Sequence, residues 1–284
     1  MYKKIIVVTE TGSDLTPALA EEHGIHLVPM HVSLGDKTLD DGTFPAEDVC
    51  KFYEETGEAP HTSGSTPEDF MKAFDDIHAA HPDAHILYLA YSAVTTCSYH
   101  SAQLAAEGRD YVTSVDTKHV SVGLGVVVMT VADWVKEHPD ASVEEAAEFA
   151  KQVAENCKMC FIPKNLDYLR AGGRVSNVVA LTGNLLNLHP CIEILDGKLM
   201  AKKKYRGKFE KVIPKLLEEY AEANALSKEE LTLIDTPYFE ASLKALAEQS
   251  AKDLGFQSIR WLRTGCVITC HGGPGAFGIV GFNK

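Results

Sequence analysis

Short apolar runs alternate with amphipathic segments through the first half of the chain. Residues 4–8 and 85–91 are β-branched or apolar with little polar alternation, which is typical of strands buried on both faces of a parallel sheet. By the same criteria we predict further strands at residues 25–34 and 111–115, and helices at residues 15–23, 45–55, 98–107 and 122–136. This alternation predicts β-α-β units around a parallel sheet.

Capping residues support several of these helices. Ser13 or Asp14 is expected to open the first helix and Gly24 to close it, while Thr43 is a possible cap for the second. Thr66 followed by Pro67, with an acidic residue three positions after the threonine, indicates another helix start. Ser142 and Glu145 form a capping-box pattern for a helix that ends near residue 157.

The second half of the chain has a different pattern. Asp196-Gly197 between two short apolar runs predicts a β-hairpin and therefore antiparallel pairing. We predict further strands at 159–162, 259–262, 267–270 and 279–282, and helices at 208–223 and 240–254. The fold class is therefore α/β with two domains, a parallel-sheet domain at residues 1–156 and a mixed α+β domain at 157–284. We expect the ligand site at the cleft between them.

Composition narrows the class of partner. The chain has 284 residues, a formal net charge of −13 and a pI near 5.4, so neither nucleic acid nor an anionic membrane is the expected partner. No signal peptide and no apolar stretch of bilayer-spanning length is visible, which predicts a cytoplasmic protein without an integral membrane segment. The seven cysteines are irregularly spaced. For the single Cys157–Cys160 pair we favour buried thiols over zinc or redox chemistry.

Two hydroxyl-rich stretches lead into predicted helices and are candidate anion sites. Thr62 and Ser63 precede the helix that Thr66 caps, and they are not needed for that cap. The second stretch follows the strand at 85–91 and contains Ser92, Thr96 and Ser98. Hydroxyls and free amides at a helix N-terminus favour an anionic head group, and the two turns could converge on one carboxylate or phosphate.

Three further stretches carry hydrogen-bond donors or positive charge. His271 is expected at a strand end beside a glycine-rich loop, well placed to hydrogen-bond an acid. Arg170 and Arg174 flank a glycine pair, where they either contact an anion or serve a solvated helix end and a domain interface. A basic stretch follows, which is either a solvated face or a docking patch for an acidic partner; it contains Lys202, Lys203, Lys204, Arg206, Lys208, Lys211 and Lys215.

These stretches, in this order and spacing, resemble the DegV family over nearly the whole chain. The resemblance begins with Val-Thr-Glu-Thr-Gly-Ser-Asp-Leu at residues 8–15 and continues with Thr62-Ser63 before Pro67. Its most specific matches are Asn-Leu-Asp-Tyr-Leu-Arg-Ala-Gly-Gly-Arg-Val-Ser at residues 165–176, Leu-Leu-Asn-Leu-His-Pro at residues 185–190 and His-Gly-Gly-Pro-Gly-Ala at residues 271–276. Compared with the family pattern, Glu10-Thr11 replaces Asp-Ser, Ala93 replaces a serine, and Cys97 replaces a glycine.

The resemblance implies a carrier protein, not an enzyme, that holds one long-chain fatty acid in an apolar tunnel. Its carboxylate would be held at the interdomain cleft by hydroxyls at Thr62, Ser63 and Thr96, with Ser98 close by, and His271 and Arg170 match the family's donors near that head group. Some family members present the fatty acid to a separate kinase for phospholipid synthesis, so a fatty acid kinase is the candidate partner. No cofactor is expected.

Two other functions are compatible with the same residues. Ser63 or Ser98 could act as a nucleophile with His271 as its base and Asp116 as the orienting acid, although the sequence has no G-x-S-x-G motif. Alternatively, the helix N-termini and arginines would suit a phosphorylated small molecule or an isoprenoid. A long apolar cavity distinguishes the fatty acid carrier from a binder of phosphate alone.

Overall fold

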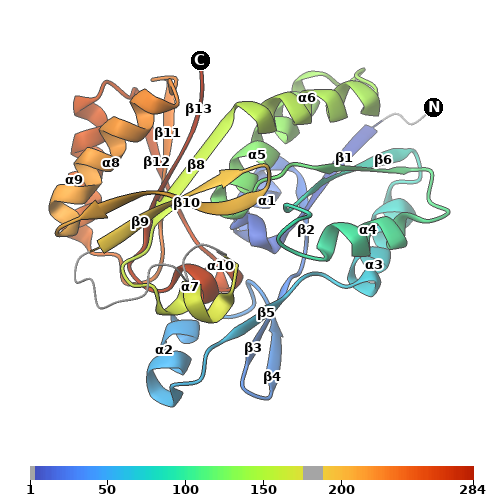
Figure 1. Ribbon diagram of the computed structural model, residues 1–284. Helices are drawn as coiled ribbons and strands as arrows, with labels where there is room; N and C mark the ends of the chain where they lie inside the picture. Colours follow the sequence, from blue (N-terminus) through green and yellow to red (C-terminus); the bar gives the residue numbers. More distant parts are fainter. Residues whose placement is uncertain (1–3, 175–187) are drawn as a thin grey trace. The chain divides into compact units, whose positions relative to one another are not determined.

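The computed structural model describes residues 4–174 and 188–284, and the chain forms two compact units (Figure 1). The first unit contains residues 1–44, 61–155 and 196–198, and the second contains residues 45–60, 156–195 and 199–284. The single boundary predicted between residues 156 and 157 stays a prediction.

The first unit is built on a four-stranded parallel sheet. Its strands are β1 (Lys4–Glu10), β2 (Ile25–Val28), β6 (Ala84–Ala90) and β7 (Val112–Asp116), in the order β2-β1-β6-β7. Every residue of β6 is buried, as expected for an inner strand covered on both faces. The predicted parallel α/β organisation of this half is confirmed.

Helices cover this sheet, and a short 3₁₀ turn, η1 (Thr11–Ser13), follows β1. The helices of this unit are α1 (Pro17–His23), α3 (Pro67–Ala80), α4 (Ser98–Ala106), α5 (Ser121–Glu137) and α6 (Val143–Asn156). Phe70 and Phe74 of α3 pack with Tyr88 of β6 in one buried cluster. Such a cluster stabilises the sheet because each large apolar side chain removed from water contributes about 2 kcal/mol.

A small antiparallel sheet precedes α3 in the sequence. It has the order β4-β3-β5, with β3 at His31–Leu34, β4 at Lys37–Asp40 and β5 at His61–Ser63. The extended run predicted at residues 25–34 is therefore two strands, interrupted at Pro29-Met30. Proline cannot donate to a strand ladder, which accounts for the break.

The second unit contains a six-stranded mixed sheet in the order β10-β9-β8-β13-β11-β12. The strands are β8 (Cys157–Ile162), β9 (Leu188–Leu195), β10 (Lys198–Arg206), β11 (Glu230–Asp235), β12 (Ser258–Arg263) and β13 (Phe277–Phe282). β11 pairs in parallel with β12 and antiparallel with β13. The predicted hairpin is confirmed, since Asp196 and Gly197 join β9 to β10 with φ values of 46° and 77°.

Several helices belong to the described part of the second unit. They are α2 (Ala46–Thr56), α7 (Asp167–Gly172), α8 (Phe209–Ala223), α9 (Ala241–Asp253) and α10 (Cys266–Gly272), the last of which precedes β13. Figure 1 shows α8 and α9 side by side along the sheet, and their apolar faces share one core cluster with β8, β11 and β13.

Three further local predictions about helices and caps were wrong. The strand predicted at residues 267–270 is part of helix α10, because a short run that is apolar all round fits a buried helix as well as a buried strand. Thr16, not Ser13 or Asp14, caps α1, and its Oγ1 accepts from Leu19 N. Thr43 does not cap α2; its hydroxyl donates to the Asp40 carbonyl at 2.7 Å.

Candidate functional site

The first unit brings the two hydroxyl-rich turns together. Ser98, at the first position of α4, is fully buried, and its Oγ accepts a hydrogen bond from Ser65 N at 3.0 Å. The Thr96 and Ser98 hydroxyl oxygens lie 3.2 Å apart. Gly64 lies directly against both: a Cβ atom there would approach each of these two oxygens to 2.5 Å. We call Thr96, Ser98 and the main chain of Gly64 and Ser65 the hydroxyl cluster.

The two sides of this cluster come from different elements. Thr96 and Ser98 follow β6, whereas Thr62 and Ser63 lie on β5, opposite Val32 and His31 of β3. Thr62 is half-buried and Ser63 is exposed. The structure therefore places β5 and the β6–α4 turn next to one another, and the binding roles of their hydroxyls stay a prediction.

Ser92 has a different environment from Thr96 and Ser98. It is fully buried, its amide donates to the His119 carbonyl at 2.9 Å, and its hydroxyl donates to the Gly197 carbonyl at 2.8 Å. These bonds hold the start of the β6–α4 turn. The hydroxyl can still accept a hydrogen bond, since its oxygen carries two lone pairs.

Arg170 and His271 both belong to the second unit. Arg170 lies on α7 with its side chain 41% exposed, and its Nη1 is 3.8 Å from Asp167 Oδ1. His271 lies in the last turn of α10, so the prediction that it follows a strand was wrong. Gly172 of α7 packs against its imidazole, and a methyl group on Gly172 would collide with Nδ1. Lack of a side chain at Gly172 therefore allows this close approach.

His271 keeps some exposed surface, whereas its ring Nδ1 is buried. Burial, and to a lesser extent the positive charge of Arg174, lowers the pKa of His271 to about 4. At neutral pH the imidazole is therefore uncharged and offers one N–H donor. It can hydrogen-bond a carboxylate but does not neutralise it.

Glu10 is a polar residue that the sequence analysis did not include among the site residues. It ends β1 and is fully buried; its Oε1 accepts from Tyr88 OH at 2.6 Å and its Oε2 accepts from Tyr91 N at 3.1 Å. Burial raises the pKa of Glu10 to about 7, even though these hydrogen bonds act in the opposite direction. The available signal was a glutamate directly after an apolar strand and immediately before a glycine-containing turn.

Asp116, the orienting acid in the hydrolase alternative, accepts hydrogen bonds from backbone amides. Its Oδ1 accepts from Lys118 N at 2.9 Å and from Ala93 N at 3.3 Å. The Ser98 hydroxyl likewise accepts the Ser65 amide. Both groups thus stabilise the turns around the hydroxyl cluster.

The cysteine pair has the expected environment. Cys157 and Cys160 are both buried on β8, and burial raises the pKa of Cys157 to about 12. A thiol with so high a pKa is a weak nucleophile and a poor metal ligand at neutral pH. Within residues 4–174 and 188–284, no group of three or more His, Cys, Asp or Glu side chains is arranged to hold a metal ion.

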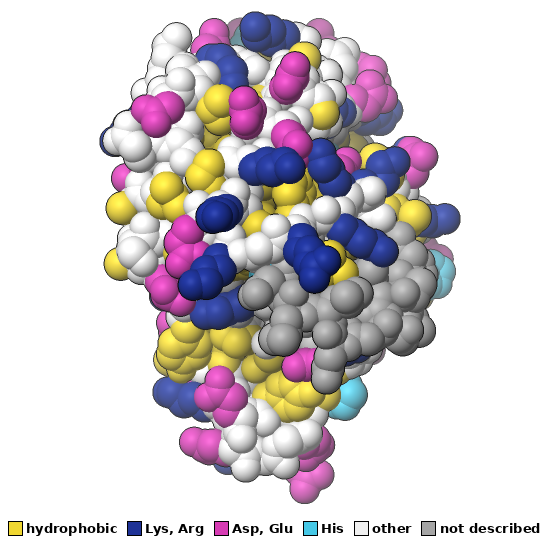
Figure 2. Space-filling view, turned by 60° about the vertical axis from the view of Figure 1, so that its left-hand side comes forward, with side chains coloured by type: hydrophobic (Ala, Val, Ile, Leu, Met, Phe, Trp, Pro, Cys, Tyr) yellow, Lys and Arg dark blue, Asp and Glu magenta, His cyan; other side chains and the backbone are white. Residues whose placement is uncertain are grey.

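The basic stretch is exposed on the second unit, and Figure 2 shows lysine and arginine side chains gathered on one face of the molecule. Lys203 forms an ion pair with Glu219 of α8, with 2.7 Å between Nζ and Oε2. Because side chains alternate along a strand, Lys202 and Lys204 of β10 point to the opposite side from Lys203. β10 is also one of the two edge strands in the described sheet.

The fold and the turns described above are shared with known proteins. A family model described as "Uncharacterised protein, DegV family" matches residues 4–284. A "Fatty acid-binding protein" of Thermotoga maritima is 28% identical over 284 residues, covering 97% of this chain and 96% of the relative. A solved structure described as "Fatty Acid Binding of a DegV family Protein from Thermus thermophilus" has a TM-score of 0.88 and 26% identity, covering 99% of this chain and 100% of that one.

A second solved structure has a similar fold. It is a Streptococcus pneumoniae Fatty Acid Kinase (Fak) B3 protein loaded with linoleic acid, with a TM-score of 0.84, 19% identity, and coverage of 99% of this chain and 100% of that one. The protein described here is thus an α/β protein with the DegV fold. The chain belongs to the DegV family.

Parts of two motifs that carry the family resemblance lie outside the described part of the chain: residues 175–176 of the motif at 165–176, and residues 185–187 of the motif at 185–190. In the part that the structure describes, no helix has both the length and the apolar composition that crossing a bilayer requires.

Proposed function

We propose that this protein binds one long-chain fatty acid and carries it without itself catalysing a reaction. The observation that carries the proposal is the full-length match to a DegV structure described by its fatty acid binding, at 26% identity and a TM-score of 0.88. The full-length relative called a fatty acid-binding protein supports the same ligand class. Ten or more methylenes buried in an apolar tunnel would contribute roughly 0.8 kcal/mol each and would dominate the affinity.

The carboxylate is proposed to bind at the interdomain cleft. Its hydrogen-bond donors would be the hydroxyls of Thr62, Ser63, Thr96 and Ser98 together with Arg170 and His271. Ser92 donates its only hydroxyl proton to the Gly197 carbonyl, so in this arrangement it would hold the turn instead of donating to the carboxylate. A buried carboxylate costs several kcal/mol unless it is hydrogen-bonded, and neutral hydroxyls satisfy it without adding a full charge. The 3.2 Å separation of the Thr96 and Ser98 oxygens supports the proposal, because two adjacent hydroxyls can donate to one carboxylate.

The proposed partner is a fatty acid kinase that would phosphorylate the carried acid for phospholipid synthesis. This step rests on the family resemblance. The exposed lysines and arginine of β10 and α8 form a positively charged surface, which is complementary to an acidic docking face on such a partner.

The ligand is identified by mass spectrometry of the purified protein, first native and then denatured. We expect a native mass that exceeds the chain mass by one fatty acid, which denaturation releases. A protein that carries a phosphorylated small molecule instead, or that remains empty when incubated with fatty acids, contradicts the proposal.

The head-group assignment is tested by the double variant Ser63→Ala/Thr96→Val. We expect at least a tenfold loss of fatty acid affinity with an unchanged circular dichroism spectrum. The control is Ser33→Ala/Thr38→Val, which removes another serine–threonine pair, 2.9 Å apart on β3 and β4. Equal affinities in the two double variants would refute the assignment but not the ligand, which mass spectrometry tests separately.

A further inference from the structure

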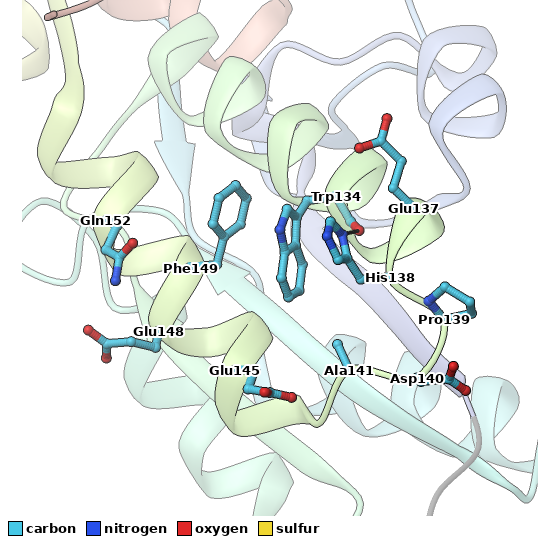
Figure 3. Close-up of a pocket in the computed structure, with 10 residues that line it drawn as sticks. All are labelled: Trp134, Glu137, His138, Pro139, Asp140, Ala141, Glu145, Glu148, Phe149 and Gln152. Atoms are coloured by element: carbon cyan, nitrogen blue, oxygen red, sulfur yellow. Dashed lines mark hydrogen bonds between the residues drawn. The ribbon is translucent and has the colours of Figure 1, made fainter.

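The first unit has a surface groove between the end of α5 and the first turns of α6. The groove has a volume of about 670 Å³, and every residue that lines it falls between positions 134 and 152 (Figure 3). None of the residues named above for fatty acid binding lines it. The groove therefore calls for a separate explanation.

Three stacked aromatic rings form one side of the groove. The rings of Trp134 and Phe149 lie 4.7 Å apart at 19°, and those of Trp134 and His138 lie 4.3 Å apart at 20°. Figure 3 shows the indole between the other two rings, so both of its faces are covered and its edge is what remains for a ligand. An aromatic edge offers apolar contact to the alkyl part of a bound group.

Hydrogen bonds hold this aromatic row in place. The backbone amide of His138 donates to the Trp134 carbonyl at 3.0 Å, and its ring Nδ1 donates to the same oxygen at 2.8 Å. At the other end, Ser142 and Glu145 form the capping box that starts α6, with hydrogen bonds of 3.2 and 2.8 Å. The groove is thus built from two fixed helix ends.

The Asp and Glu side chains among the residues that line the groove are not matched by any lysine or arginine there. These acids are Glu137, Asp140, Glu145 and Glu148. Among the described residues, no cation forms an ion pair with Glu137 or Asp140. Glu148 has one partner, Lys151 at 3.3 Å, in an exposed pair of the kind that contributes less than about 1 kcal/mol. The negative end of the α5 dipole and the positive end of the α6 dipole both lie at the groove and oppose one another, so the acidic side chains set the sign of its potential.

We propose that this groove binds a lysine- or arginine-bearing segment of a partner protein. The alkyl stems of such side chains would lie along the edges of Trp134 and Phe149, and their charged ends would reach Asp140 and Glu148. Charge complementarity selects this occupant, because the four acids would repel a carboxylate, a phosphate or an anionic membrane surface.

The test uses a hexa-arginine peptide with blocked termini and the full-length protein. The chain has two tryptophans, Trp134 and Trp261, so two indole N–H signals are expected in a ¹H–¹⁵N spectrum and Trp261→Phe assigns them. We expect the peptide to shift the Trp134 signal saturably, to leave the Trp261 signal unchanged, and to bind more weakly as salt increases. Absence of a shift at millimolar peptide, or equal shifts of both signals, overturns the proposal.

A matched pair of variants separates the groove from general acidity. Asp140→Asn/Glu148→Gln should weaken peptide binding at least tenfold. Glu68→Gln/Asp83→Asn removes the same two charges from exposed positions at α3 and the turn after it, and should bind the peptide like the unmodified protein. Equal weakening in both double variants would show a diffuse charge effect and overturn the site.

A second copy of this chain is the alternative occupant, since its basic stretch is also cationic. In that case the Trp134 signal would shift with protein concentration without any peptide, and the mass in solution would rise accordingly. This outcome would overturn the proposal of a separate partner protein.

Discussion

Tyr88 donates a hydrogen bond to Glu10 across 2.6 Å in the interior of the first unit, where both side chains are fully buried. Glu10 is the last residue of β1, and Tyr88 lies on β6, the neighbouring strand of the parallel sheet. Glu10 also accepts the amide of Tyr91, the residue before Ser92. The carboxyl group therefore links the end of β1 to the turn that carries the proposed head-group hydroxyls.

This buried carboxyl should make stability depend on pH. Its pKa rises from 4.5 to about 7 on folding, so the folded protein holds the proton more tightly than the unfolded chain. Stability from this group is present below pH 4.5 and falls as pH rises to 7, by about 3 kcal/mol in the free energy of unfolding. In Glu10→Gln this decline should be absent, as measured by chemical denaturation at pH 5 and pH 8. A difference between the two proteins that is the same at both pH values would contradict the prediction.

Gly172 should tolerate no side chain because it packs on the His271 imidazole. We expect Gly172→Ala to displace the ring and to lower the free energy of unfolding by about 1–3 kcal/mol. Gly272→Ala is the matched control: it is also the last residue of its helix, but a Cβ atom there would lie 3.6 Å from its nearest neighbour, Thr236 Cγ2. If urea denaturation gives the two variants equal stability, the close packing at His271 has no energetic importance.

A methyl group on Gly64 should disrupt the hydroxyl cluster. In Gly64→Ala the new Cβ atom would lie 2.5 Å from the hydroxyl oxygens of Thr96 and Ser98, and these two side chains would have to move away from it. We expect at least a tenfold loss in affinity for a fluorescent fatty acid, determined by direct titration. Unaltered affinity would show that the carboxylate does not bind at this cluster.

The cations of β10 should affect partner docking but not the fatty acid. We expect Lys202→Glu/Lys204→Glu to weaken binding to a fatty acid kinase at least tenfold, most strongly at low salt, because both side chains are exposed. Lys51→Glu/Lys252→Glu reverses two other exposed lysines of the same unit and serves as the control. Surface plasmon resonance gives the affinity, and mass spectrometry gives the fatty acid content. Docking that is equally strong in both variants would leave the basic stretch as a solvated face.

Local chemistry accounts for what could be predicted from the sequence. The capping boxes at Thr66 and Ser142, the closure of α1 by Gly24 and the Asp196-Gly197 hairpin all form as expected. Each depends on residues only a few positions apart, whose side chains satisfy nearby backbone groups or permit positive φ. The alternation of apolar runs and helices likewise predicted the parallel sheet, and the ordered motifs indicated the DegV family.

Only the tertiary structure decided which distant groups meet. The Ser65 amide finds the Ser98 hydroxyl 33 residues away, and the Tyr88 hydroxyl finds Glu10 across 78 residues. Likewise, the apolar run at residues 267–270 became a helix because its neighbours in the fold, not its composition, determine how it is buried. The sequence by itself determined most of the elements, which follow from short-range propensity and pattern, and its ordered motifs determined the family. The buried polar contacts required the folded chain, because their energy depends on partners and solvent exclusion that no local pattern encodes.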